Sequence, residues 1–280
     1  MKMRNLLTFP PIALAALTTL SSVALAQEGQ VFRRPGEPEQ RPPSLYQKIQ
    51  NTGPGGPAPR RDLSGSWAGP LEPKAGEVPP MTALGQTRFK LNVPDPFSAR
   101  SNDPWAMCDP FGFPRSATNE TRGISFAQMP DRIVIMTQYQ KVWRQVWMDG
   151  RGLPKNVGAK GGPDSRWYGY SIGHWDGDYT FVVETTGVDD STWIDRRGYP
   201  HSVEMHVEER YTRTSHNDLE LTVTIDDPKI YTKPFVIATN KFKWIPNQED
   251  EEQLCVPSEA ISYLNTVAIP AGQDKATDKK

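Results

Sequence analysis

The sequence is poor in net charge and in long apolar runs. Its formal net charge is −1 over 280 residues, and removing the two positive charges of Lys2 and Arg4 with an N-terminal segment takes it to −3. A chain with this balance has no excess of basic residues with which to bind nucleic acid or an anionic membrane. Beyond residue 25 no stretch is apolar enough to span a bilayer. We therefore expect neither nucleic acid nor a membrane as a partner.

Several motifs of catalysis and cofactor binding are missing as well. No G-x-S-x-G occurs, so the chain lacks the nucleophile elbow of many Ser/His/Asp hydrolases. The stretch from Gly158 to Gly162 is rich in glycine, but no G-K-[ST] follows it, which argues against a phosphate-binding loop. We expect no organic cofactor.

Only two cysteines are present, Cys108 and Cys255. In an oxidising compartment they are expected to form a disulfide, and the long loop they close predicts a stabilisation of roughly 4–5 kcal/mol. The alternatives are two reactive thiols or half of a metal site. Neither cysteine has another cysteine or a histidine at ligand spacing, which favours the disulfide.

The N-terminus has the pattern of a cleaved signal peptide. Lys2 and Arg4 precede an apolar run from Leu6 to Leu25, which ends in the small-x-small site Ala24-Leu25-Ala26. A membrane anchor is the alternative, but Pro10-Pro11 interrupts the run. We predict a periplasmic or secreted protein.

Four segments follow from composition. Residues 1–26 are the signal peptide, and 27–61 form a disordered leader rich in Pro, Gly and Arg. Residues 62–270 form the folded domain, and 271–280 are a loose tail. Two short helices are expected within the domain, at 79–90 with Thr82 as its N-cap and at 257–267.

From Ile124 onward the pattern is typical of strand after strand. Short alternating segments are separated by turn residues such as Asp176-Gly177-Asp178. This predicts an all-β fold of about nine or ten strands with short peripheral helices. A single antiparallel meander barrel of the lipocalin or calycin kind removes the sheet edges, and an open two-sheet sandwich is the alternative.

The hairpin from about 203 to 226 carries the candidate site. The residues Val203, Met205, Val207 and Tyr211 alternate with Glu204, His206, Glu208 and Arg210, with Glu209 as an exception on the apolar face. Histidine both gives and takes protons near neutral pH. We expect catalytic roles for His206, His201, Glu204 and Asp195, and substrate binding by Arg210 and Glu208. The alternative is a solvated strand face.

A strand expected beside this hairpin presents aromatic residues at period two. Tyr168, Tyr170 and His174 are predicted to bind substrate as part of a pocket lining. A zinc ion on the histidines is possible but the spacing is unspecific, and we assign no metal. The tryptophans 143, 147, 167 and 175 are interpreted as core, with sugar stacking as the alternative.

Five motifs together resemble a large family of secreted bacterial β-rich proteins to which no activity has been assigned. They are D-L-S-G-x-W, C-D-P-x-G-F-P-R, W-Y-G-Y-S-I-G-x-W-x-G-D, H-S-x-x-M-H-V-E-E-R-Y and T-I-D-D-P-K-x-Y-T-K-P, and they extend from Asp62 to about Glu259. Gly65-Ser66-Trp67 is also similar to the first strand of lipocalin-type barrels. The resemblance implies secretion and a β-rich fold, and it implies no catalytic residue.

Two functions are compatible with these observations. The first is an enzyme, a hydrolase, lyase or isomerase, that acts on a small sugar or phenolic molecule by His/carboxylate acid–base chemistry. The second is a non-catalytic carrier of a small molecule in the periplasm. The orientation of the hairpin's polar face, into a cavity or out to water, distinguishes them.

Overall fold

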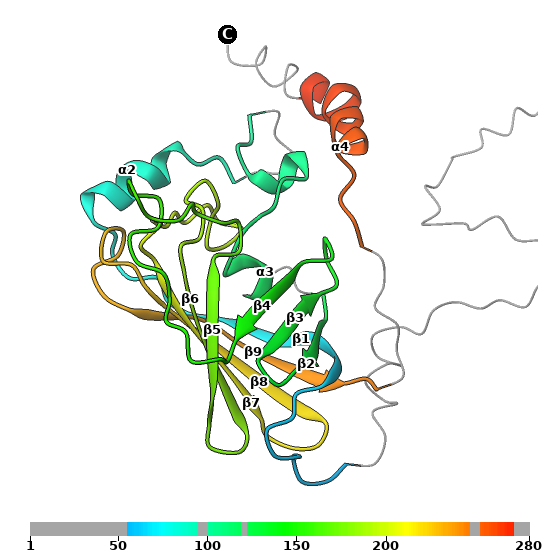
Figure 1. The fold of residues 1–280 in the computed structure, drawn as a ribbon. Helices are drawn as coiled ribbons and strands as arrows, with labels where there is room; N and C mark the ends of the chain where they lie inside the picture. Colours follow the sequence, from blue (N-terminus) through cyan, green and yellow to red (C-terminus); the bar gives the residue numbers. More distant parts are fainter. Residues whose placement is uncertain (1–54, 95–99, 119–121, 247–252, 272–280) are drawn as a thin grey trace, which may run out of the picture. The chain divides into compact units, whose positions relative to one another are not determined.

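The computed structural model of the chain describes residues 55–94, 100–118, 122–246 and 253–271. Nine strands form a closed barrel in chain order (Figure 1). They are β1 (Gly65–Ala75), β2 (Ile124–Gln128), β3 (Arg132–Thr137), β4 (Trp143–Trp147), β5 (Tyr170–Asp176), β6 (Thr180–Thr186), β7 (His206–Arg213), β8 (Asp218–Asp226) and β9 (Phe235–Trp244). Pairing of β9 with β1 closes the ring, which confirms the predicted barrel and the strand count.

One pairing departs from the predicted antiparallel meander. β4 and β5 run parallel, and their register contains only Val146 opposite Ser171 and Trp147 opposite Ile172. Residues 148–169 connect the two strands and return the chain to the starting end of β4 before β5 begins. The expectation of a purely antiparallel barrel was therefore wrong at this point. The barrel wall is held here by the shortest of its strand pairings.

Alternation along the strands places the core inside the barrel. On β8, Leu219, Leu221, Val223 and Ile225 are fully buried, as the sequence predicts. On β7, Val207 and Tyr211 are also fully buried. Since successive side chains point to opposite faces of a strand, the polar residues between them lie on the outside.

Trp67 of β1 is fully buried beside the guanidinium of Arg213. Its indole Nε1 donates a hydrogen bond to the Leu63 carbonyl oxygen at 2.9 Å. The Arg213 guanidinium lies 4.9 Å from the Trp67 ring centroid and donates to the carbonyl oxygens of Asp62 and His216. These contacts satisfy the backbone where the chain enters β1.

None of the helices is part of the strand pairing, and one of them, α3 (Arg115–Thr118), is buried, with its Ala117 packed in the core. α2 (Ala83–Leu91) begins at the predicted cap, where the Thr82 hydroxyl oxygen accepts from the Gly85 amide at 3.1 Å. The others are the 3₁₀ helix η1 (Pro104–Met107), α4 (Pro257–Tyr263) and the π-helix η2 (Leu264–Ala268). The predicted Cys108–Cys255 disulfide is present and joins the chain after η1 to the segment before α4.

Part of the predicted domain division lies outside the described residues. This holds for the signal peptide 1–26, for 27–54 of the leader and for 272–280 of the tail. The described end of the leader contacts the barrel: the Gly56 carbonyl oxygen accepts from the His216 amide, and Arg61 contacts Asp178 and Gly177 on the β5–β6 turn.

Candidate functional site

The outer face of β7 carries three of the nine residues expected to form the site, and Glu204 lies just before the strand. Their side-chain exposed fractions are 62% for Glu204, 41% for His206, 40% for Glu208 and 39% for Arg210. His206 Nε2 lies 3.2 Å from the Glu184 carboxylate on β6, and Arg210 pairs with Asp176 on β5. The set is a row of exposed ion pairs and hydrogen bonds. Such pairs contribute at most about 1 kcal/mol each.

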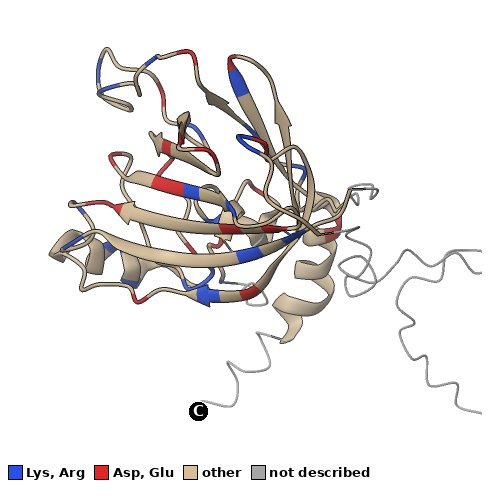
Figure 2. Cartoon of the chain, turned by 90° about the horizontal axis from the view of Figure 1, so that it is seen from below, with Lys and Arg blue, Asp and Glu red and all other residues tan. Residues whose placement is uncertain are grey.

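The expectation that this face lines a pocket is therefore wrong in its geometry. The face points to solvent, and charges of both signs are interspersed along the strands (Figure 2). β6 also lies between β5 and β7, so Tyr168, Tyr170 and His174 are not on a neighbouring strand. His174 is exposed on β5. A catalytic role for the outer-face residues stays a prediction.

His201 is fully buried, in the loop that precedes β7. Its Nδ1 lies 3.1 Å from the Ser202 carbonyl oxygen and its Nε2 lies 2.9 Å from the Thr192 hydroxyl. Because a carbonyl oxygen only accepts, Nδ1 carries the proton that it donates to Ser202, while the Thr192 hydroxyl beside Nε2 also lies 2.9 Å from the Asp189 carbonyl oxygen. Burial lowers the pKa of His201 below its ordinary value. Both ring nitrogens are thus engaged in holding the loop.

Asp195 is likewise buried and engaged locally. Its carboxylate accepts from the Arg197 guanidinium Nε at 2.6 Å and from the Arg197 backbone amide at 2.9 Å. Among the described residues, no hydrogen bond joins Asp195 to His201. The two residues expected to cooperate in proton transfer therefore stabilise separate parts of the 189–201 loop.

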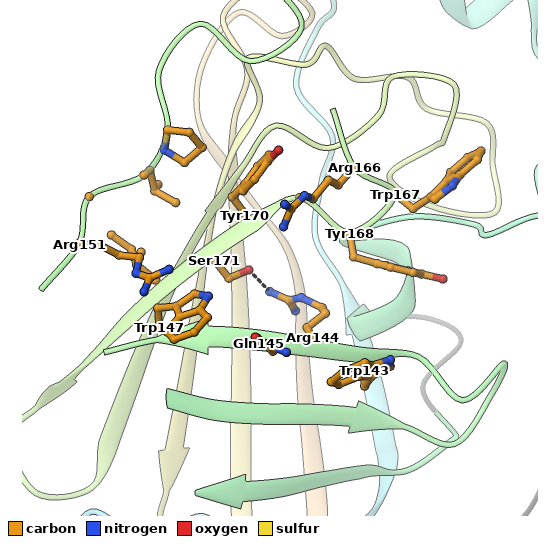
Figure 3. Close-up of a pocket in the computed structure, with 15 residues that line it drawn as sticks. Trp143, Arg144, Gln145, Trp147, Arg151, Arg166, Trp167, Tyr168, Tyr170 and Ser171 are labelled. Atoms are coloured by element: carbon orange, nitrogen blue, oxygen red, sulfur yellow. Dashed lines mark hydrogen bonds between the residues drawn. The ribbon is translucent and has the colours of Figure 1, made fainter. Parts of the chain in front are cut away.

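A cleft of about 560 Å³ opens where β4 and β5 pair so briefly. It has the size of typical small-molecule sites. Its lining residues come from β4, from the connection 148–169 and from the start of β5 (Figure 3). They are Trp143, Arg144, Gln145, Trp147, Arg151, Gly152, Leu153, Pro154, Arg166, Trp167, Tyr168, Gly169, Tyr170, Ser171 and Ile172. Five are aromatic, three are arginines, and none is an aspartate or a glutamate.

The floor of the cleft is a buried ion pair. Arg144 Nη1 and Nη2 donate to the two carboxylate oxygens of Glu209 at 3.0 and 2.7 Å, and Nη2 also donates to the hydroxyl groups of Ser171 and Thr185. The Tyr211 hydroxyl donates to Glu209 at 2.6 Å. Burial by itself would lower the pKa of Arg144, but the Glu209 carboxylate outweighs it and raises that pKa. The pair explains why Glu209 interrupts the apolar face of β7.

Arginine and aromatic side chains stack along the walls. The Arg151 and Arg132 guanidinium groups lie 3.7 and 4.1 Å from the Trp147 ring centroid. Arg166 lies 4.0 Å from the ring centroid of Tyr170. Cation–π contacts of this kind hold both partners in fixed orientations. Figure 3 shows Arg151 and Trp147 on one side of the cleft and Tyr168 and Trp167 on the other.

Two wall residues are more exposed than core packing allows. The exposed fraction is 63% for Trp143 and 42% for Trp167. Tyr168 is partly buried, and this burial raises the pKa of its hydroxyl to about 12. The interpretation of Trp143, Trp147 and Trp167 as core was therefore wrong. Trp175 alone of the four tryptophans packs against the core, 5.3 Å from Phe181.

A second cleft of about 380 Å³ shares Trp143 and Tyr168 with the first. Its remaining walls include Lys141 and the Cys108–Cys255 disulfide. Trp143 and Tyr168 thus lie between the two adjoining clefts, and the disulfide lies at the edge of the second cleft.

The sequence identified Tyr168 and Tyr170 correctly as pocket-lining residues and missed the rest of the cleft. The sequence of β4, W-R-Q-V-W, did not reveal its cleft residues. In it, Trp143, Gln145 and Trp147 alternate with Arg144 and Val146. Both faces of that strand contain a polar residue, so the alternation does not show which face is buried. Three aromatic residues within four positions, Trp167, Tyr168 and Tyr170, were the clearer indication.

In the described part of the chain, no group of three or more His, Cys, Asp or Glu side chains lies close enough together to hold a metal ion. None of the helices in the described ranges has the length and apolar character needed to cross a membrane. A scan against protein-family models finds no match for this chain, and a search of curated proteins finds none either.

Proposed function

We propose that the chain binds a small ring-bearing molecule, of the sugar or phenolic type, in the cleft between β4 and β5. The observation that carries the proposal is the exposure of Trp143 and Trp167 within a cleft that five aromatic residues line. Exposed indole rings cost free energy in water and stack well on the faces of sugars and aromatic rings. The buried Arg144–Glu209 pair beneath fixes the cleft's floor.

Binding is favoured over catalysis by the chemistry of the lining. The fifteen lining residues include no histidine, aspartate, glutamate or cysteine, which are the usual groups for acid–base or nucleophilic steps. Tyrosine can also transfer protons, but burial raises the pKa of Tyr168 to about 12, which makes its hydroxyl a poor base near neutral pH. The carrier alternative is therefore the better supported of the two functions.

We further propose that the carrier works outside the cytoplasm, as a periplasmic or secreted protein. The Cys108–Cys255 disulfide supports an oxidising compartment, and the N-terminal pattern supports export. The resemblance to secreted bacterial β-rich proteins points the same way. A small molecule remains the expected partner.

Calorimetry with a panel of monosaccharides, disaccharides and phenols tests the binding proposal. Trp143→Ala removes an exposed ring from the cleft and is expected to weaken binding at least about fivefold, since stacking of a ring is worth about 1 kcal/mol or more. Tyr179→Ala is the matched control, because Tyr179 is 43% exposed on the β5–β6 turn and outside the cleft. Equal affinities of both variants and the wild type would refute this location.

A further inference from the structure

The cleft has an excess positive charge, which belongs to Arg166. Arg144 is paired with Glu209, and Arg151 is held by both carboxylate oxygens of Asp149 at 2.9 and 3.1 Å from its Nε. The Arg166 guanidinium, in contrast, makes no ion pair or side-chain hydrogen bond with any described residue and only stacks on Tyr170. The cleft therefore carries one uncompensated positive charge.

The remaining polar groups of the walls are almost all donors. The indole N–H groups of Trp143, Trp147 and Trp167 form no hydrogen bond with a described residue, and neither does the Tyr168 hydroxyl. Indole and guanidinium groups donate and never accept. The pKa of about 12 keeps the Tyr168 hydroxyl protonated at neutral pH, so it can donate as well. Such a lining favours a ligand rich in oxygen acceptors.

We propose that the ligand of this cleft is a ring-bearing carboxylate, with the carboxylate paired to Arg166 and the ring stacked on the aromatic walls. The inference rests on the proposed binding function and names the class of ligand. A guanidinium offers two parallel N–H groups that match the two oxygens of a carboxylate. One uncompensated charge balances one carboxylate, whereas a phosphate monoester would bring nearly two negative charges.

The placement of Arg166 supports this role. Its backbone amide donates to the Gly187 carbonyl oxygen, and its carbonyl oxygen accepts from Asp189 and Gly169, so the main chain is fixed on three sides. Stacking on Tyr170 restricts the side chain further. A guanidinium group that is already held in place before the ligand arrives loses less conformational entropy on binding.

The test compares matched acid and neutral probes on the full chain by calorimetry. Glucuronate is compared with glucose, and 4-hydroxybenzoate with 4-hydroxybenzyl alcohol, so that the two arms separate sugar acids from aromatic acids. The acid of one pair is expected to bind about tenfold more tightly than its neutral partner, a difference that low salt enlarges. Arg166→Gln should remove that preference, because the acid should lose much more affinity than its neutral partner. Arg210→Gln, which removes the same charge from the outer face, should change neither.

Three outcomes would overturn the inference. If acid and neutral probes bind the wild type equally at the cleft, the claim that the ligand is a carboxylate is refuted, while the proposed binding function stands. If Arg166→Gln keeps the preference for the acid, another group recognises the carboxylate. If no probe of either pair binds, the binding function itself fails together with the inference.

Discussion

Arg144 and Glu209 meet in the barrel interior from positions 65 residues apart in the sequence, with 3.0 and 2.7 Å between their paired nitrogen and oxygen atoms. Neither side chain has more than 5% of its surface exposed. The pair joins β4 to β7 across the barrel, beneath the cleft. It is the structural feature on which the shape of the site depends.

Removing one partner of this pair is expected to destabilise the fold strongly. Glu209→Ala leaves the Arg144 guanidinium buried without a counter-charge, and the free energy of unfolding should fall by about 3–5 kcal/mol. Glu208→Ala, one residue away on the outer face, should change it by no more than about 0.5 kcal/mol. Urea unfolding of both variants measures the difference.

A double replacement separates the charge penalty from lost packing. Arg144→Met with Glu209→Leu removes both buried charges and keeps apolar volume. The free energy of unfolding should then recover most of what Glu209→Ala loses. A double variant no more stable than Glu209→Ala would show that the pair's specific geometry, and not its charge balance, supports the barrel.

His201 predicts a pH dependence of stability. Burial holds the pKa of His201 in the folded state below the value of about 6.5 for the unfolded chain. Between those two pKa values the unfolded chain binds more protons than the folded chain, so the free energy of unfolding rises with pH. The stabilisation linked to His201 is therefore complete above about pH 6.5 and is lost as the pH falls through the folded-state pKa. Replacing the ring by glutamine, His201→Gln, should flatten this part of the stability curve.

Unfolding midpoints between pH 7.5 and 5 check the prediction. His206→Gln is the control, since the His206 side chain is 41% exposed and makes a single contact with Glu184. An unchanged slope in His201→Gln, or a slope lost in His206→Gln, would assign the pH dependence to another group.

The disulfide is expected to stabilise the chain substantially. Cys108 and Cys255 are 147 residues apart, so reduction should lower the free energy of unfolding by roughly 4–5 kcal/mol on the chain-entropy account. Reduction should also increase hydrogen exchange first in the segment 253–271. Mass spectrometry of the non-reduced, denatured chain should detect no free thiol. Labelling of both cysteines in that state would contradict the bond.

Patterns that depend on local chemistry were predictable from the sequence. The alternation from Leu219 to Ile225 identified the buried face of β8, and Thr82 identified the start of α2. With only two cysteines, one pairing was possible. The alternation and the helix cap depend only on residues close in the sequence, and the cysteine pairing had a single solution. A single sequence is therefore enough to predict these features.

Features that depend on distant partners were not predictable. In the sequence, Glu209 is an exception on the apolar face of its strand. Its buried position is explained by the ion pair with Arg144, which lies far away in the sequence, on β4. The parallel pairing of β4 with β5 depends on the path of residues 148–169, which have no regular pattern. Alternation separated the two faces of β7 but left open whether its polar face met a cavity or water.

The cleft itself is tested most directly by the indole N–H signals in a nitrogen–proton NMR spectrum. Each tryptophan gives one such signal, assignable through Trp→Phe variants. Saturation with a ring-bearing ligand is expected to shift the signals of Trp143, Trp147 and Trp167 and to leave that of buried Trp67 in place. A separate pocket beside α4 is lined by Trp105, Val256 and Leu264. Shifts confined to Trp105, with the three cleft signals unmoved, would contradict the account.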